Sequence, residues 1–583
     1  MPNLIADAKN RINEILLSAY QQAAKAGELP SDAELKGTVE IPKDLVNGDF
    51  AANHAMAGAK ALHMSPRAIA DALVKNACLD NTWFDSIEVA GPGFINFRLN
   101  HSWYEDVLHE INKSGDDYGK IDEGKGRSVM VEFVSANPTG PMHMGNARGG
   151  VLGDALASVL SMAGYKSYRE FYVNDTGNQI EKFAQSIDLR YRQLVLGEES
   201  VYFLKDDETE ENAKVPEGAI IFPKDCYHGE DIITIAKLFR EKYGDEYLNK
   251  PKEERFEVMS TFGLDNNIPK MKKDLERYGI SYDNWFFESS LHNTGYVEDT
   301  MNELTRLGYT YEKDGALWLK TTELVEGCEK DDVLRRANGF YTYFASDIAY
   351  HRNKLLVRGF DNAINVWGAD HHGHVARLKG ALDALGLDGT HRLDIVLMQL
   401  VKLQENGVEV RMSKRTGKMI SLSNLLDDIP VDAARYFFNS RPESAVIFDL
   451  ELAKRQDSEN PVYYVQYAHA RICTMIANLE SEGYGVLEDA DLSLLNEEAE
   501  KDLIRQLALL PETIRIAARD YDPSHINTYV TELATRFHKF YTVCRLKGEK
   551  DDILNARLYL ADTVRKVLEI SLNVIGVSAP EKM

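Results

Sequence analysis

The stretch from residue 129 to residue 160 constrains the fold more than any other, because it fixes a strand, a turn and a helix in that order. Its first six residues, V-M-V-E-F-V, are β-branched or apolar except for Glu132, and such a run is typical of a core strand. Pro138, Gly140 and Pro141 interrupt the run and predict an irregular turn. Apolar residues then return at helical spacing, so the stretch predicts a strand–turn–helix unit of an α/β domain.

The turn of this unit is suited to an anion. The first turn of a helix carries unpaired N–H groups and a partial positive charge, which favour a phosphate. His143 and Asn146 lie in the turn, three residues apart, at the mouth of that site. Neither the dinucleotide fingerprint nor the P-loop spacing is present. On these residues alone, an ordinary turn between a core strand and a helix remains the alternative.

The whole chain has the composition of a globular protein, with 583 residues that predict about three or four domains. No apolar run reaches the roughly 20 residues of a membrane span, and the first residues lack the order of a signal peptide. Five scattered cysteines without a C-x-x-C pair argue against a zinc site and a disulfide framework, and therefore favour the cytoplasm. The net charge of −25 disfavours loose binding of polyanions, although a specific RNA needs only one basic face.

The first 115 residues predict a compact α+β unit. A helix is expected over residues 3–24 and another over 65–73, with Ser65 as its N-cap and Pro66 in its first turn. Residues 87–99 predict two short strands around a Gly-Pro-Gly turn. A purely structural domain explains this unit, yet three residues near a turn are candidates for RNA contact: Asn47, Phe50 and Asn53.

A second strand at residues 168–173 completes a βαβ unit and so predicts a parallel sheet. Residues 198–230 are polar and acidic, and we expect a solvated surface insertion there. The following residues alternate helical segments with apolar runs, such as 315–319 and 363–367. These runs predict a continuation of the same α/β domain up to about residue 381.

Two clusters in that region contain candidate ligand-binding side chains. Tyr343 and Asp347 are four residues apart and share one face if a helix begins there. Asp370, His371 and His374 follow a strand-like run, where residues line the ligand crevice of an open α/β sheet. A metal site is the alternative for this His cluster, but no further acidic or cysteine partner has ligand-like spacing.

Basic and aromatic residues mark two later segments. The loop R-M-S-K-R at 411–415 suits an anion, although an exposed basic loop has the same composition. From residue 460 the pattern is almost entirely helical. There Tyr467 and Arg471 form one Tyr/Arg group, and Tyr541 and Arg545 form another. Aromatic stripes are usually core, but such pairs also suit base stacking and phosphate contact.

Taken together, these motifs carry a family resemblance. H-M-G-N at 143–146 and R-M-S-K-R at 411–415 are similar to the "HIGH" and "KMSKS" signatures of class I aminoacyl-tRNA synthetases. The segments F-V-S-A-N-P-T-G-P, N-D-T-G-N-Q-I, T-Y-F-A-S-D-I-A-Y-H, G-A-D-H-H-G-H and V-D-A-A-R-Y-F-F resemble arginyl-tRNA synthetases of the bacterial type. The V-A-G-P-G-F-I-N-F-R-L run resembles that family's N-terminal domain, so the likeness covers essentially the whole chain.

The resemblance implies a multidomain α/β architecture. It has an N-terminal α+β domain that contacts tRNA, a Rossmann-like parallel-sheet catalytic domain, the MSK loop with a connecting segment, and an all-α helical bundle that binds the anticodon. The corresponding residues are 1–115, 116–400, 401–455 and 456–583. The family default is a monomer.

The same resemblance implies ATP-dependent attachment of L-arginine to its tRNA through an arginyl-adenylate, with Mg²⁺ carried by ATP and no structural zinc. It assigns catalysis to His143, Asn146 and Lys414, and ATP binding to Pro141, His143, Gly145, Asn146, Arg411, Met412, Ser413, Lys414 and Arg415. It assigns arginine binding to Glu132, Asn137, His143, Tyr343, Asp347, Asp370 and His371. It assigns tRNA binding to Asn47, Phe50, Asn53, Tyr467, Arg471, Arg545 and Met583.

Three other functions fit parts of the sequence. A synthetase-derived, non-catalytic RNA-binding protein is disfavoured because the residues assigned to catalysis and arginine are intact. A small nucleotidyltransferase would not need the helical region after residue 455. A cysteinyl enzyme of similar architecture holds its substrate with zinc, and the sequence has no cysteine cluster for it.

Two residues depart from the family pattern. Arg411 replaces the first Lys of the second signature and keeps its charge, whereas Asn146 replaces the second His of the first. An amide still forms hydrogen bonds, but it is shorter and uncharged. We therefore predict that function is kept with a somewhat weaker contact to ATP.

Because that loss is small, the Asn146→His substitution should raise the rate of arginine-dependent ATP–PPi exchange by less than about tenfold, which is roughly 1.4 kcal/mol. Exchange rates of both forms at saturating arginine and tRNA check this. A larger gain would show that Asn146 is a substantial handicap.

Overall fold

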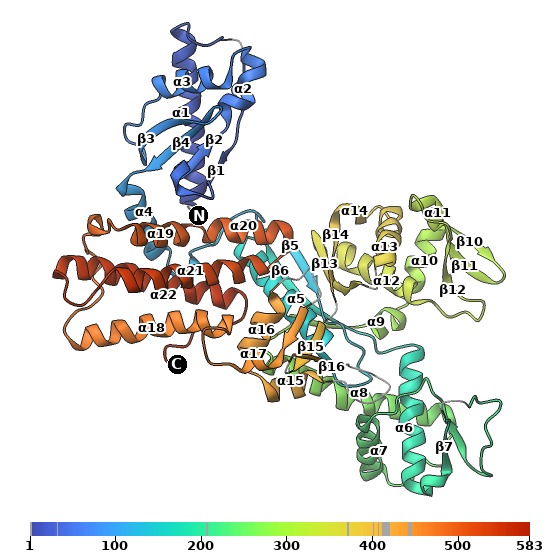
Figure 1. The fold of residues 1–583 in the computed structure, drawn as a ribbon. Coiled ribbons are helices and arrows are strands. Elements are labelled where there is room, and N and C mark those ends of the chain that lie inside the picture. The colour runs from blue at the N-terminus through green and yellow to red at the C-terminus, as the bar shows by residue number, and fades with distance from the viewer. Residues whose placement is uncertain are drawn as a thin grey trace.

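The computed structural model describes residues 3–31, 33–205, 208–369, 372–399, 401–405, 407–410, 420–440 and 446–583. Figure 1 shows a central region built on a β-sheet between a helical C-terminal domain and two outer lobes. The N-terminal domain extends away from the rest beyond the helical domain. In the described ranges, no helix is both long enough and apolar enough to cross a membrane.

The N-terminal domain is a four-stranded antiparallel sheet in the order β1-β2-β4-β3, packed against helices. The Ser65 hydroxyl accepts a hydrogen bond from the Ala68 N–H, which confirms the predicted N-cap. The Gly-Pro-Gly turn joins β3 to β4 as predicted. The elements are α1 (Leu4–Lys25), β1 (Val39–Glu40), η1 (Leu45–Asn47), β2 (Phe50–Ala52), α2 (His54–Leu62), α3 (Pro66–Asn76), β3 (Phe84–Ala90), β4 (Phe94–Leu99), α4 (His101–Ser114) and η2 (Gly115–Asp117).

One residue of this domain has a different role from the one predicted. Phe50 is only 1% exposed, and its ring packs edge-on against Phe84. The expected contact of this side chain with RNA is therefore wrong. A large aromatic ring buried in the sheet of a small domain stabilises the core of that domain. The sequence pattern predicted Phe50 near a turn, whereas the residue begins strand β2.

The central sheet has five parallel strands in the order β14-β13-β5-β6-β9. The predicted βαβ unit is confirmed, since α5 connects β5 to β6. Strand order reverses between β5 and β13, which is where open α/β sheets bind ligands. The elements around this sheet are β5 (Ser128–Glu132), α5 (Met144–Met162), β6 (Lys166–Val173), β9 (Asn284–Phe287), α12 (Tyr343–Arg352), the π-helical turn η4 (Asn353–Val357), β13 (Asn362–Gly368), α13 (His372–Ala384), α14 (Gly389–Arg392) and β14 (Leu393–Met398).

The run at 315–319 does not join the central parallel sheet. It forms part of a separate antiparallel sheet in the order β10-β11-β12. Asp314 and Gly315 both have positive φ, at 52° and 75°, so they close a tight hairpin that pairs the run with the strand before it. This lobe contains α9 (Glu288–Asn293), α10 (Tyr296–Arg306), β10 (Thr310–Lys313), β11 (Ala316–Leu319), α11 (Thr321–Leu324) and β12 (Asp332–Arg335).

The predicted acidic insertion at 198–230 is part of a larger lobe. Two short parallel strands from it pack on helix α6, which precedes them in the chain, and α6 in turn packs on α7 and α8. Phe222 and Val201 are buried there, so the segment is not simply a solvated charge run. The lobe contains α6 (Asn178–Leu196), η3 (Glu198–Ser200), β7 (Val201–Phe203), β8 (Ile220–Phe222), α7 (Glu230–Tyr243) and α8 (Lys252–Arg277).

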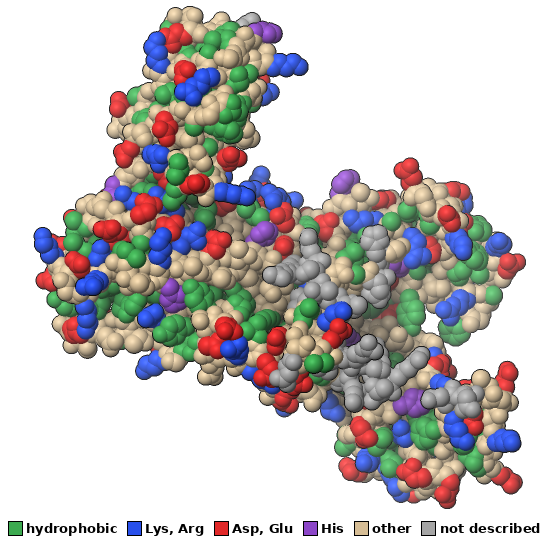
Figure 2. Space-filling model, in the orientation of Figure 1, with side chains coloured by type: hydrophobic (Ala, Val, Ile, Leu, Met, Phe, Trp, Pro, Cys, Tyr) green, Lys and Arg blue, Asp and Glu red, His purple; other side chains and the backbone are tan. Residues whose placement is uncertain are grey.

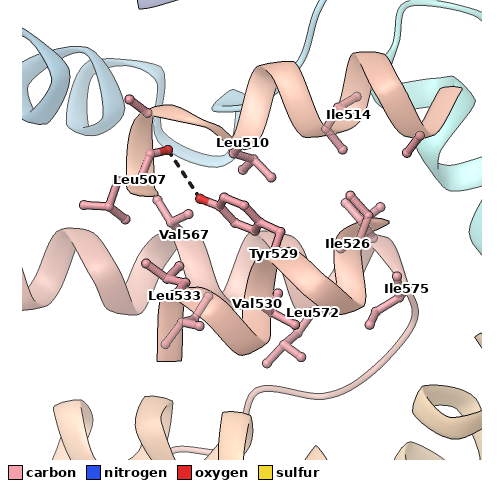
Figure 3. Packing of buried hydrophobic residues seen from close by; sticks show 14 of the residues in the cluster. Leu507, Leu510, Ile514, Ile526, Tyr529, Val530, Leu533, Val567, Leu572 and Ile575 are labelled. Carbon is pink, nitrogen blue, oxygen red and sulfur yellow. Dashed lines mark hydrogen bonds between the residues drawn. The ribbon is translucent and has the colours of Figure 1, made fainter. Parts of the chain in front are cut away.

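The C-terminal region is helical, as predicted. Figure 3 shows its core, in which the Tyr529 ring lies among leucine, isoleucine and valine side chains and its hydroxyl donates to the Leu507 carbonyl. The helices are α18 (Pro461–Ser481), η7 (Leu492–Leu494), α19 (Glu498–Ala508), α20 (Leu510–Asp520), α21 (Ser524–Val543) and α22 (Asp551–Val574). The connecting segment before them contains β15 (Val401–Glu405), β16 (Val408–Val410), α15 (Leu422–Asp428), α16 (Val431–Asn439), β17 (Val446–Asp449) and α17 (Leu450–Lys454).

A fully buried arginine joins these regions. One nitrogen of Arg435 on α16 lies 2.5 Å from a carboxylate oxygen of Asp154 on α5. The same guanidinium donates to the carbonyls of Tyr278, Gly279 and Ile575. Arg435 therefore connects α5, the end of α8 and the end of the helical domain.

We predict that Arg435→Met will destabilise the protein by about 3–5 kcal/mol, because it leaves three buried carbonyls and one carboxylate oxygen of Asp154 without their donor, while Arg169 stays on the other oxygen. Thermal unfolding followed by circular dichroism measures the loss. Arg306→Met is the control, since Arg306 pairs with Glu303 at an exposed surface and should change the midpoint little. Equal melting of the two variants would contradict the connecting role.

Candidate active site

The candidate site lies at the carboxyl ends of β5 and β13. Glu132 ends β5 and is register-paired with Asn365 of the neighbouring strand. The chain leaving β5 runs through the Pro/Gly turn and enters α5 at His143. The anion-attracting end of α5 is thereby placed at the reversal point of the sheet.

The H-M-G-N turn is a reciprocal cap of α5. The Nδ1 atom of His143 accepts from the Gly145 N–H at 3.1 Å, and the Oδ1 atom of Asn146 accepts from the His143 N–H at 3.0 Å. A Cβ atom at position 145 would lie 2.9 Å from the His143 ring, so a glycine is required there. Asn146 thus has a structural role that its place in the motif did not indicate.

The same turn is attached to the segment that follows the second signature. His143 forms an isolated antiparallel bridge with Ser421, and the Leu422 N–H donates to the Met142 carbonyl at 2.8 Å. Ser421 in turn caps α15. Ser421 and Leu422, which follow the second signature in the chain, therefore lie beside the N-terminus of α5.

Glu132 lies in a polar environment behind this turn. It is 6% exposed, and its two oxygens accept hydrogen bonds from Lys354 Nζ at 2.5 Å and Ser135 Oγ at 2.9 Å. Val134 and Ser135 have φ values of 68° and 42°, which are strained for residues other than glycine. This strain ends β5 two residues earlier than the apolar run predicts and turns the chain back over Glu132.

The predicted pair on α12 is confirmed as a helical pair. Tyr343 and Asp347 lie in its first turns, and the Asp347 carboxylate bonds His374 Nε2 of α13 at 2.9 Å. Tyr343 is 45% exposed. Asn137 and Pro141 are also exposed, in the turn before α5.

Seven predicted site residues lie outside the described residues: Asp370, His371, Arg411, Met412, Ser413, Lys414 and Arg415. Among the described residues, the structure places the His143 turn beside Ser421, which follows the second signature in the chain. Glu132 lies at the end of β5, the strand that leads into that turn. In the described part of the chain, no group of three or more His, Cys, Asp or Glu side chains is arranged to hold a metal ion.

Four residues predicted to contact RNA line one hollow of about 580 Å³ in the helical domain: Tyr467, Arg471, Arg545 and Met583. The Arg471 guanidinium lies 4.3 Å from the ring centre of Tyr541, which also lines the hollow. Figure 2 shows acidic and basic side chains mixed over the visible face, in keeping with the net charge of −25. A local hollow with aromatic and basic walls suits a nucleotide better than that mixed surface does.

The two remaining candidates for RNA contact in the N-terminal domain, Asn47 and Asn53, differ in how free their side chains are to bind a partner. Asn47 is exposed at the end of η1. The Asn53 amide is used within the domain, since it exchanges hydrogen bonds with the Thr38 backbone at 2.7 Å and with the Thr38 hydroxyl at 2.8 Å. Of these two, Asn47 is the better placed for an outside partner.

Three buried residues of the site were missed by the sequence reasoning. Lys354, Asn365 and His351 form hydrogen bonds behind Glu132 and Asp347. The available signal was polar residues inside apolar runs, such as Asn365 within A-I-N-V-W. Such residues must find buried partners, but the sequence does not say which.

The chain matches known proteins over its full length. Residues 7–99 match the arginyl tRNA synthetase N-terminal domain, residues 108–462 the catalytic domain of class I (R) tRNA synthetases, and residues 465–583 the DALR anticodon binding domain. The arginine–tRNA ligase of Caldanaerobacter subterraneus subsp. tengcongensis is 53% identical over 586 residues, covering 100% of both chains. The chain belongs to the arginine–tRNA ligase family. The family resemblance and the class I fold predicted from the sequence are thereby confirmed.

Two further members of this family agree. The arginine–tRNA ligase of Acetivibrio thermocellus is 49% identical over 586 residues, again with 100% of both chains covered. The arginyl-tRNA synthetase structure from Thermus thermophilus covers 97% of this chain and 99% of its own, with a TM-score of 0.70 at 21% identity. At that identity, the likeness to the Thermus structure supports the fold of an arginine–tRNA ligase.

We predict that Asn146→Ala will cost about 1 kcal/mol of stability, because the His143 N–H loses its acceptor, whereas Asn146→Asp keeps an acceptor and stays near the wild-type value. Thermal unfolding of the two variants measures this difference. Both substitutions remove the amide NH₂, so a rise in the KM for ATP that both share would assign a nucleotide contact to that group. Equal stability of Asn146→Ala and the wild type would contradict the capping role.

Proposed function

We propose that the chain attaches L-arginine to its tRNA in two steps at the site between β5 and β13. In the first step the arginine carboxylate attacks the α-phosphorus of Mg²⁺-bound ATP, giving arginyl-adenylate and pyrophosphate. In the second, a ribose hydroxyl of the terminal adenosine of tRNA takes the arginyl group and AMP leaves. The observation that carries this assignment is a capped helix N-terminus beside buried and half-buried carboxylates at the reversal point of a parallel sheet.

The turn at His143 binds the phosphates in this proposal. Since Nδ1 of His143 accepts from the Gly145 N–H, the neutral ring carries its proton on Nε2 and can donate it to a phosphate oxygen. The N-terminus of α5 adds a positive potential. Lys414, Arg411 and Arg415 are assigned to the other side of the triphosphate, where they neutralise charge on the leaving pyrophosphate. Positioning and electrostatics of this kind supply most of the catalysis of nucleotidyl transfer.

The two acidic residues bind the ends of arginine. Glu132 takes the α-ammonium, with Asn137 on the carboxylate side, and Asp347 takes the guanidinium beside Tyr343. A guanidinium is a planar fork that matches a carboxylate with two hydrogen bonds, whereas the ammonium of lysine is a point charge. Substitution of lysine would therefore leave acceptors unpaired, which is a strong basis for discrimination.

The hollow between α18 and α21 binds a tRNA nucleotide by stacking on Tyr467 and pairing with Arg471 and Arg545. The matching DALR anticodon binding domain supports the anticodon as the part of tRNA bound there. Asn47 is the proposed contact of the N-terminal domain. Cytoplasmic location and a monomeric state remain predictions.

We predict that Asp347→Asn will raise the KM for arginine about 10–100-fold and leave the KM for ATP nearly unchanged, because it removes one charge from the guanidinium site. Arginine-dependent ATP–PPi exchange, with and without tRNA, measures both constants. Asp314→Asn in an exposed turn is the matched control and should have no effect. Absence of any arginine-dependent exchange in the unmodified protein, with tRNA present, would favour the non-catalytic RNA-binding alternative.

A further inference from the structure

Four polar side chains form a continuous row across the central sheet, at the level where β5 ends. The register pairs Asn365 of β13 with Glu132 of β5, Glu132 with Glu170 of β6, and Glu170 with Asn284 of β9. Asn365 and Glu170 are fully buried and Glu132 is 6% exposed. Two carboxylates therefore lie side by side in the interior, where each needs a counter-ion.

One short segment supplies both cations. Lys354, in the π-helical turn η4, is fully buried, and its Nζ lies 2.5 Å from Glu132 Oε2 and 3.0 Å from Asn365 Oδ1. Arg358 follows the turn and donates to both oxygens of Glu170, at 2.8 Å and 2.5 Å. π-Helical turns are often found at functional sites, and this one brings two cations onto neighbouring strands.

The two ion pairs differ in the hydrogen bonds that remain available. Glu170 accepts two bonds from Arg358, one from the Tyr350 hydroxyl and one from the Asn284 amide, which fills a carboxylate with about four lone-pair sites. Among the residues that the structure describes, only Lys354 and Ser135 donate hydrogen bonds to Glu132, so its carboxylate retains acceptor sites for a ligand. Glu170 is thus suited to hold structure, whereas Glu132 is suited to bind.

The Lys354 side chain is also connected to the other end of the site. The Asn365 amide donates to His351 Nε2 at 2.8 Å, and His351 Nδ1 donates to the Asp347 carbonyl at 2.8 Å. Burial, with the charge of Lys354 nearby, lowers the pKa of His351 well below its usual range, so the ring is neutral and makes both bonds. A buried path of hydrogen bonds therefore joins Glu132 to the backbone of Asp347.

We propose that Lys354 is a positioning residue of the amino-acid site, which holds the Glu132 carboxylate in place and oriented toward the α-ammonium of arginine. Through Asn365 and His351 it also fixes the spacing between Glu132 and Asp347, and this spacing selects the length of the amino acid. Lys354 itself is fully buried and does not touch the substrate. The inference rests on the proposed binding of arginine by Glu132 and Asp347.

The test uses Lys354→Met and an arginine analogue without the α-ammonium, 5-guanidinopentanoate. The substitution removes the donor that orients the Glu132 carboxylate, so this carboxylate is no longer held toward the α-ammonium. We expect the KM for arginine in ATP–PPi exchange to rise at least about tenfold. The inhibition constant of the analogue and the KM for ATP should stay close to their values in the unmodified protein, because neither ligand has an α-ammonium. A parallel rise for arginine and for the analogue would overturn the proposal.

Arg358→Met is the matched control, since it breaks the neighbouring ion pair of the same row and the same segment. It should lower the melting midpoint about as much as Lys354→Met but leave the KM for arginine unchanged. An equal rise in that KM would reduce the role of Lys354 to stability, and so would overturn the proposal.

Ser135→Ala keeps the test decisive if Lys354→Met does not fold. It removes the neutral donor to Glu132 without burying an unpaired charge. A smaller rise in the KM for arginine, with none for the analogue, is expected, and equal changes would contradict the proposal. Failure of the proposed function is seen separately, as a lack of arginine-dependent exchange in the unmodified protein.

Discussion

The buried ion pair between Arg435 and Asp154 determines how the functional regions lie relative to one another. Asp154 belongs to the helix that begins at His143, and Arg435 also donates to the Ile575 carbonyl at the end of the last helix. A Cβ atom at position 576 would lie 2.0 Å from the guanidinium, and Gly576 has a φ of 65°, so a glycine is needed for both reasons. The end of the helical domain is therefore built around a side chain that also holds α5.

Buried charges recur where the catalytic region needs fixed geometry. Glu132, Glu170 and Asp154 each have an arginine or lysine partner in the interior. Such pairs add little net stability compared with apolar residues of similar size, because desolvation offsets the attraction. These buried ion pairs instead fix the geometry, because a buried charge has few alternative partners. Neighbouring carboxylates with dedicated cations on adjacent parallel strands therefore give the candidate site a rigid base.

The local elements could be predicted because their causes are local. The strand of residues 128–132, the helix after His143 and the Ser65 cap follow from apolar periodicity and capping chemistry. The antiparallel lobe was missed although Asp314-Gly315 is a strong hairpin signal, since the apolar run after it was read without the turn. Phe50 and Lys354 could not be placed from sequence. Their surroundings come from residues 34 and 222 positions away, Phe84 and Glu132, which no local pattern reveals.

The C-terminal tail extends the connection that begins at Arg435. One turn earlier on α16, Asp432 accepts from the Ser578 N–H at 3.0 Å and from the Gln466 amide of α18 at 2.8 Å. His469 of α18 bonds the Pro580 carbonyl at 3.0 Å, and the tail then reaches the hollow that Met583 lines. Both the tail and α5 are therefore held by α16. Because Arg435 is fully buried and held by carbonyls on both sides, movement of α16 would be transmitted to the helix that starts at His143.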